Sequence, residues 1–221
     1  MDQHIDRHFD ESLRELKGQI MLMGSKVEAM VADSMKALGL RDQKLAEQII
    51  ERDHAVNALE VSIDEQCIEL LARYQPAATD LRFITRGLKI VADLERIADL
   101  AVNIASRVID ISRQGESPID LTQMTSIVSL MLKESISSFV TKDVAKAEGV
   151  LSNDDMVDDL TECYIKELLE RAKKEPEKFD IIFPATSIVR HLERIADHAT
   201  NISELAIFTA KGRDVRHKKP H

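Results

Sequence analysis

The sequence is poor in the residues that build β-sheets and tight turns. Its 221 residues include 7 glycines, 5 prolines and 4% aromatic side chains. Sheet proteins need frequent turns and favour aromatic and β-branched residues, so this composition points to helices. Apolar residues make up 44% of the chain, which is enough for a hydrophobic core. We therefore expect an all-α protein.

Cysteines, long apolar runs and excess positive charge are also scarce. Two cysteines, Cys67 and Cys163, fit a reducing compartment better than a disulfide framework. The longest uncharged run, residues 121–132, is too short to cross a bilayer, and the charged N-terminus does not resemble a signal peptide. A net charge of −9 argues against nucleic acid as a partner, and the one basic segment, residues 211–219, is most simply a solvated terminus. We expect a soluble, cytoplasmic protein.

Apolar residues recur at spacings of three and four, which is the pattern of amphipathic helices. This pattern predicts six helices, at residues 9–38, 42–74, 78–113, 121–140, 143–174 and 179–211. Asp42 is a good N-cap for the second helix, and Gly39 is a suitable stop for the first. Pro76 and Pro176 each separate the last two helices of a set of three.

The chain contains an internal repeat. A shift of 101 residues aligns Val27 with Val128 and Asp53 with Asp154, and for the third and sixth helices the shift becomes 98. With that shift, residues 94–104 match residues 192–202 at nine of eleven positions, both reading LERIAD-x-A-x-N-I. The repeat predicts two pseudo-symmetric three-helix bundles, residues 1–115 and 116–221, the second with the short basic tail.

Acidic and amide side chains form rows on the polar faces of these helices. In the third helix, Glu95, Asp99 and Asn103 form such a row, because residues four apart share a helix face. On a helical wheel this row lies well away from the apolar core stripe, which includes Ala98. The second and fifth helices carry similar rows, and the fifth is thinner because Thr161 stands where the second has Glu60. The candidate residues are, in the first half, Asp53, Asn57, Glu60, Glu95, Asp99 and Asn103, and in the second, Asp154, Asp158, Glu193, Asp197 and Asn201.

A solvated helix face is the simplest reading of any single pair of carboxylates four residues apart. Two features favour metal binding instead: the rows recur in both halves with the same neighbours, and each half has a second acidic helix able to lie alongside. Oxygen ligands without His or Cys suit iron, manganese, magnesium or calcium better than a structural zinc.

The other motifs in the sequence are weak evidence for a metal site or for catalysis. Glu51 and His54 form a single Glu-x-x-His, whereas a di-iron bundle needs two, both facing the interior. His191 and His198 flank the acidic row of the sixth helix without counterparts in the third. We interpret them as surface histidines, with a role in that one site as the alternative. The chain has no glycine-rich phosphate loop, nucleophile elbow or catalytic Cys–His pattern, so we expect no enzyme.

The duplicated LERIAD-x-A-x-N-I segment, each copy preceded by a helix with D-x-x-V-N/D-x-L, resembles the PhoU family of phosphate-transport accessory proteins. The resemblance covers essentially the whole chain. One departure is that Ala98 and Ala196 stand where the family commonly has glycine, at positions on the core stripe rather than in the acidic rows. The resemblance implies multinuclear iron or zinc clusters on the acidic faces, with magnesium or manganese as alternatives.

The resemblance also implies a function and partners. Family members are negative regulators of the phosphate-starvation response and connect the ATPase subunit of a phosphate ABC transporter to a sensor histidine kinase. Such a protein meets the membrane only through these partners, and a homo-oligomer, most simply a dimer, is expected. Two other functions stay open: an accessory to a low-affinity phosphate permease, and a metal-dependent phosphoesterase, against which the unenclosed rows and the missing acid–base groups argue.

Overall fold

Six α-helices account for almost all of the structure. The computed structural model describes residues 2–212. Its elements are α1 (Asp2–Leu40), α2 (Gln43–Tyr74), α3 (Ala78–Ser112), α4 (Thr122–Thr141), α5 (Val144–Lys174), a 3₁₀ turn η1 (Pro176–Lys178) and α6 (Phe179–Lys211). The predicted all-α class and the six helices are confirmed. Most of the basic segment at the C-terminus lies outside the described residues.

The largest error in the helix prediction concerns the start of α1, which begins at Asp2 instead of residue 9. Residues 2–8 lack an apolar stripe, so periodicity gave no signal there, but they contain no glycine or proline to interrupt a helix. An ion pair one turn apart, from Arg7 Nε to Glu11 Oε1 at 3.1 Å, supports this polar segment.

The turn after α1 differs from the prediction as well. Gly39 lies inside the helix, and Arg41 adopts the left-handed backbone conformation that ends it, with φ of 54°. The predicted N-cap of α2 is correct, because Asp42 accepts a hydrogen bond from the backbone N–H of Leu45 at 3.0 Å. In the second half, Asp143 caps α5 in the same way, accepting from the N–H of Lys146 at 3.2 Å.

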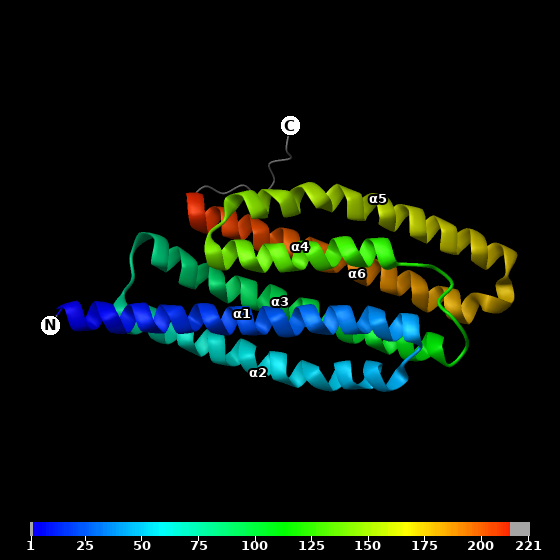
Figure 1. Ribbon diagram of the computed structural model, residues 1–221, viewed down its shortest axis with the longest axis horizontal. Coiled ribbons are helices and arrows are strands. Elements are labelled where there is room, and N and C mark those ends of the chain that lie inside the picture. The colour runs from blue at the N-terminus through cyan, green and yellow to red at the C-terminus, as the bar shows by residue number, and fades with distance from the viewer. Residues whose placement is uncertain (1, 213–221) are drawn as a thin grey trace.

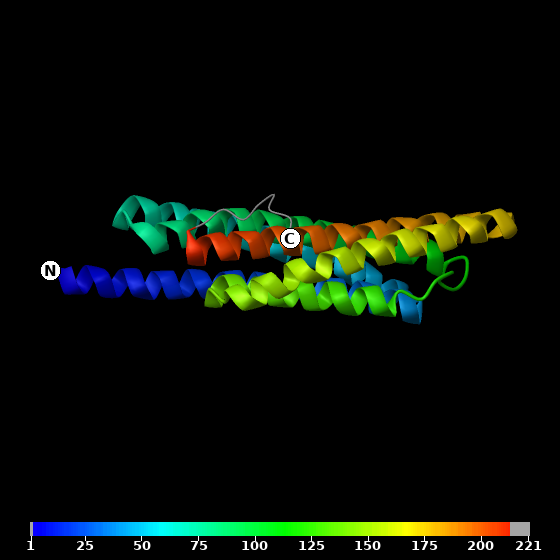
Figure 2. The ribbon, with the colours of Figure 1, turned by 90° about the horizontal axis from the view of Figure 1, so that it is seen from above.

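The helices form two bundles that lie side by side along their length (Figure 1). The first bundle packs α1, α2 and α3 against one another, and the second packs α4, α5 and α6. The bundles meet through α3 with α6 and through α1 with α4, while α2 and α5 lie on the outer flanks. Figure 2, turned by 90°, shows α1 and α4 in one layer and α3 and α6 in the other.

The α3–α6 contact makes the two bundles one structural unit. Arg82 of α3 donates from Nε to the carbonyl oxygen of Thr209 of α6 at 3.4 Å, and the guanidinium of Arg86 lies 4.3 Å from the ring centroid of Phe208. Phe83 of α3 stacks on Phe139 in the other bundle, with ring centroids 4.7 Å apart. Buried residues from all six helices belong to one continuous core.

The acidic segments lie on α3 and α6, the two helices at the centre of the fold. The apolar residues of the LERIAD-x-A-x-N-I segments are buried, as predicted, and both alanines that replace the family glycine are in the core, Ala98 at 0% and Ala196 at 1% exposure. The core therefore fixes the rotation of each helix about its axis, and that rotation directs the intervening carboxylates toward α2 or α5.

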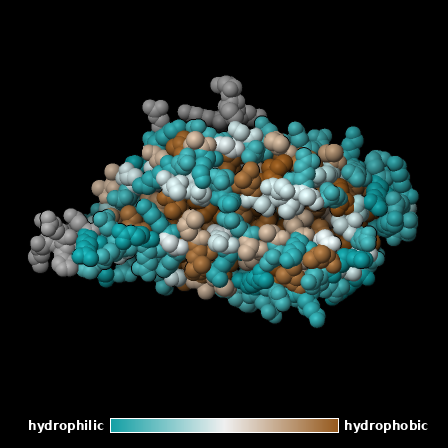
Figure 3. Space-filling model, in the orientation of Figure 1, coloured by the Kyte–Doolittle hydropathy of each residue, from teal (hydrophilic) through white to brown (hydrophobic). Residues whose placement is uncertain are grey.

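The face that α1 and α4 present has exposed apolar side chains. Figure 3 shows apolar side chains gathered along the middle of the face that α1 and α4 present. Met21, Leu22 and Leu130 are exposed large apolar residues of these helices. Gly24 of α1 allows a close approach to α4, because a Cβ atom at this position would lie 2.9 Å from two carbon atoms of Ile136.

Candidate functional site

The first acidic face lies between α2 and α3. The carboxyl groups of Glu60 and Glu95, one from each helix, are half-buried and interact electrostatically. Burial raises the pKa of Glu95, and the neighbouring charges of Asp99, Glu60 and Asp53 raise it further. Burial likewise raises the pKa of Glu60, with additional contributions from Asp64 and Asp99. The predicted rows of the two helices therefore face each other.

Several oxygen atoms in this face have no hydrogen-bond donor among the described residues. Asn57 donates from Nδ2 to Oδ2 of Asp53 at 2.8 Å, while Oδ1 of Asp53 and Oδ1 of Asn57 are buried without a partner. Oδ1 of Asp64, two turns after Asn57 along α2, is also buried and unpartnered. Buried acceptors without a donor are costly, and a bound cation would satisfy them.

Arg96 offsets part of the negative charge. Its Nη1 lies 3.3 Å from Oδ2 of Asp99 and its Nε 3.5 Å from Oε2 of Glu95. Glu95 and Arg96 are adjacent and do not share a helix face, but the long side chain of arginine reaches the neighbouring carboxylate. The Arg96 side chain is 65% exposed, so water screens these ion pairs and they leave the face acidic.

The second acidic face lies between α5 and α6 and is poorer in ligands. Burial raises the pKa of Asp197, and Asp158 raises it further. Burial also raises the pKa of Asp154, although a hydrogen bond to its Oδ1 from the Thr200 hydroxyl at 3.1 Å opposes the shift. The Thr200 hydroxyl thus bonds to Asp154 across the groove, whereas Oδ1 of Asp53 in the first face is buried without a partner. Thr161, at the position of Glu60, is buried and carries no charge.

The oxygen ligands of the two faces suit a hard cation, but they do not form a closed cage around one ion. Carboxylate and amide oxygens from two helices supply each face, and neither predicted row contains sulfur or imidazole. Within the described part of the chain, no three His, Cys, Asp or Glu side chains lie close enough together to enclose one ion. The rows lie on the surface, where carboxylate rotamers can change, so the residues fit metal ions by their chemistry while their present arrangement encloses none.

Asn103 and Asn201 lie at the far ends of the rows and are exposed on their helices. Glu51 and His54, the single Glu-x-x-His, are exposed on α2 and do not face the bundle interior, as a di-iron site would require.

The interpretation of His198 as a surface histidine was wrong. Its Nδ1 lies 2.8 Å from Oδ1 of Asp93, so this residue links α6 to α3. His191 is half-buried, and burial, with Arg194 and Arg107, lowers the pKa of its imidazole. The repeat gave no signal for this contact, because His191 aligns with Asp93 and His198 with Leu100, so neither histidine has a histidine counterpart in α3.

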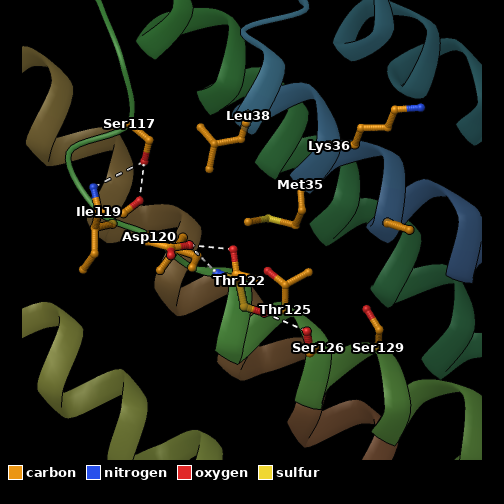
Figure 4. Close-up of a pocket in the computed structure, with 13 residues that line it drawn as sticks. Met35, Lys36, Leu38, Ser117, Ile119, Asp120, Thr122, Thr125, Ser126 and Ser129 are labelled. Atoms are coloured by element: carbon orange, nitrogen blue, oxygen red, sulfur yellow. Dashed lines mark hydrogen bonds between the residues drawn. The ribbon is translucent and has the colours of Figure 1, made fainter.

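A separate cavity of about 330 Å³ lies on the α1–α4 side (Figure 4). Met35 and Lys36 of α1 border it, opposite the hydroxyl groups of Thr122, Thr125 and Ser126 of α4. None of the predicted site residues lines this cavity. The acidic faces are therefore distinct from it.

The fold and the acidic faces together define a class: an internally duplicated six-helix protein with a carboxylate-rich groove in each half. Comparisons with known proteins agree with this. Residues 20–108 and 121–206 both match the family profile described as PhoU domain. The match places one domain copy in each half, while the division after residue 115 stays a prediction.

Relatives match almost the whole chain. The phosphate-specific transport system accessory protein PhoU homolog of Pseudomonas putida is 38% identical over 97% of this chain and 85% of its own length. The accessory protein PhoU of Escherichia coli K12 is 32% identical over 98% of this chain and 91% of its own. The crystal structure of PhoU from Pseudomonas aeruginosa superposes with a TM-score of 0.89 at 37% identity, covering 93% of this chain and all (100%) of that one.

A second solved structure, the phosphate transport system regulatory protein PhoU from Streptococcus pneumoniae, has a TM-score of 0.87 at 30% identity over 94% of this chain and 99% of its own. The chain belongs to the PhoU family. Its relatives are named as accessory or regulatory proteins, and the chain shares their non-enzymatic class, as predicted. Among the described residues, no helix is long and apolar enough to span a membrane.

Proposed function

We propose that the protein is an accessory and regulatory protein of phosphate-specific transport that represses the phosphate-starvation response when phosphate is plentiful. The observation that carries this proposal is similarity over nearly the whole chain, in both sequence and fold, to proteins named for that role. In this proposal the protein contacts the ATPase subunit of a phosphate ABC transporter and a sensor histidine kinase. It works in the cytoplasm and reaches the membrane only through them.

The acidic faces take part in this function by binding metal ions. The supporting observations are the electrostatic coupling of Glu60 and Glu95 across two helices, and the unpartnered buried oxygens of Asp53, Asn57 and Asp64. A bound cation would neutralise repelling carboxylates and hold α2 against α3. Iron, zinc, manganese and magnesium are the candidates, and the all-oxygen donor set favours the harder ions among them.

The regulatory role is tested in a deletion strain. Without the protein, phosphate-starvation enzymes should be produced in high phosphate, and a plasmid copy should restore repression. Unchanged repression in the deletion strain would overturn the regulatory proposal.

The metal role is tested separately on purified protein. The quadruple variant Glu95→Ala, Asp99→Ala, Glu193→Ala and Asp197→Ala should bind less metal by elemental analysis, with helicity preserved because these residues lie outside the core. A variant with wild-type metal content would refute the site assignment and leave the regulatory proposal standing.

A further inference from the structure

Two cavities follow one another along the groove between α1 and α4. One, of about 330 Å³, is bordered by Met35 (Figure 4), and the other, of about 370 Å³, by Ser25. Ala32 of α1 and Ser129 of α4 line both cavities, so the two are contiguous. Between Ser25 and Gly39, which lie at its two ends, the groove follows about 21 Å of helix, or about four turns.

The outer side of α1 along this groove has exposed residues at alternating spacings of three and four. They are Leu22, Ser25, Ala29, Ala32, Lys36 and Gly39. This is the spacing by which one helix packs along another, whereas the solvent-facing side of a surface helix is normally polar and charged. Only one of the six residues is charged. The pattern therefore indicates that another helix lies on this side of α1.

Large apolar side chains are exposed on the same two helices. Met21 and Leu22 of α1 are 43% and 50% exposed, and Leu130 of α4 is 52% exposed. Figure 3 shows apolar side chains along the middle of this face. A helix lying over α1 and α4 would remove apolar surface from water, and the cavities beside Met35 and Ser25 would receive its side chains.

The charges that line the groove differ in how far they are already offset. Lys36 and Lys133 are exposed and have no ion pair within 4 Å in the described part of the chain. Asp120, at one end, accepts hydrogen bonds from the backbone N–H and the hydroxyl of Thr122 at 2.9 and 2.6 Å. Glu28 is half-buried near Lys133, and burial raises the pKa of its carboxyl. The two lysines are thus the exposed charges of the groove that a partner can pair with.

We propose that the α1–α4 groove binds a helix of a partner protein, with small and apolar side chains against the groove and carboxylates on its flanks facing Lys36 and Lys133. The inference rests on the proposed function for the partner, which is one of the proteins through which the chain regulates phosphate transport. A second copy docked by the same face would bring lysines, not carboxylates, to these positions. The groove is separate from both acidic faces, so metal ions and the partner helix bind independently.

The direct test is fluorescence anisotropy of the full-length protein with two synthetic helical peptides, each about 18 residues long. One has alanine and leucine at spacings of three and four, flanked by glutamates, and the other has glutamines in place of the glutamates. The glutamate peptide should bind saturably, and the glutamine peptide about threefold or more weakly, because it lacks partners for the lysines. No saturable binding of the glutamate peptide, or equal binding of the two, would overturn the proposal.

Two variants locate the peptide on the protein. Ala32→Trp fills the groove where the cavities join and should weaken binding of both peptides about tenfold or more. Lys36→Glu should weaken binding of the glutamate peptide and leave the glutamine peptide unaffected. Ala58→Trp on α2 and Lys89→Glu on α3 are the matched controls, since both residues are exposed on other helices, and should bind like the wild type. Wild-type affinity in Ala32→Trp and Lys36→Glu would overturn the proposal.

The deletion strain tests the groove in the cell. A plasmid copy of Ala32→Trp should fail to restore repression, and Ala58→Trp should restore it. Full repression with Ala32→Trp would overturn the proposal, as would a dimer in sedimentation analysis that Ala32→Trp converts to monomers, because a second copy would then be the occupant. Unchanged repression in the deletion strain itself would instead overturn the proposed function, and the peptide titrations would still decide the groove.

Discussion

Asp93 of α3 and His198 of α6 connect the two halves of the molecule through a contact of 2.8 Å between Oδ1 and Nδ1. The two side chains are 18% and 20% exposed, so the contact is largely shielded from water. It lies in the α3–α6 interface, close to both acidic segments. The same interface that unites the bundles thus positions the helices that carry the carboxylates.

Removing this contact should loosen the interface between the halves. His198→Ala and Asp93→Ala should each lower the free energy of unfolding by about 1–2 kcal/mol, because a hydrogen-bonded and partly buried group loses its partner. A double-mutant cycle in urea should give a coupling energy of about 0.5–1.5 kcal/mol. His54→Ala, at an exposed site on α2, is the control. Additive effects of the two substitutions would contradict a direct interaction.

In the metal-free protein, the carboxyl groups of the acidic faces should contribute more to stability as the pH falls from neutrality. Burial, followed by neighbouring carboxylates, raises the pKa values of Glu95, Glu193 and Asp197. These groups bind protons more tightly in the folded state than in the unfolded state, so acidification favours folding until the ordinary carboxyl range near about pH 4 is reached. In chelator-treated protein these carboxyl groups should therefore favour a higher Tm on acidification, whereas His191, whose pKa burial lowers, acts in the opposite direction.

A variant isolates this effect from other titrating groups. Glu95→Gln, Glu193→Gln and Asp197→Asn together should reduce the gain in Tm on acidification. Excess Mn²⁺ should raise the Tm of the wild type at neutral pH more than at acid pH, because protons compete for the carboxylates. A wild type and a variant with the same pH dependence would refute the coupling of these carboxyl groups to stability.

Gly24 should tolerate a side chain poorly, because α4 lies directly against it. A Cβ atom at this position would lie 2.9 Å from Cδ1 and Cγ2 of Ile136, so Gly24→Val should cost about 1–3 kcal/mol through overpacking. Gly18 is on the same helix with no atom within 4 Å of a built Cβ, so Gly18→Val should be nearly neutral. Thermal unfolding of the two variants tests this difference, and equal Tm values would contradict the close approach.

The two cysteines should differ strongly in reactivity. Cys67 is buried, and burial, with the charge of Asp64, raises the pKa of its thiol to about 12. Cys163 is exposed on α5. Since the thiolate is the reactive form, a thiol reagent should modify Cys163 in the native protein and Cys67 only after unfolding. Mass spectrometry of Cys163→Ser should show no rapid modification, and rapid labelling of that variant would show that Cys67 is accessible.

Periodicity and capping predicted much of this fold because they are local. Apolar spacing predicted five of the six helices to within a residue or two, and the register of the repeat predicted that Ala98 and Ala196 lie in the core. The start of α1 was missed because residues 2–8 have no apolar stripe, and a polar helical segment gives no periodic signal. The acidic rows were predicted in the same way as the core, because the period of the α-helix determines which residues lie on each face.

The sequence by itself determined the class and which carboxylates share a helix face, because each depends on residues a few positions apart. It also determined the duplication, because residues 94–104 and 192–202 have nearly the same sequence. Only the tertiary structure decided that Glu60 faces Glu95, that Asp154 is bonded by Thr200, and that Asp93 meets His198 across the bundles. These contacts depend on how helices distant in the sequence pack, and that packing follows from the fit of the whole core. The acidic segment shared by both halves therefore has two different surroundings, which the repeat alone did not reveal.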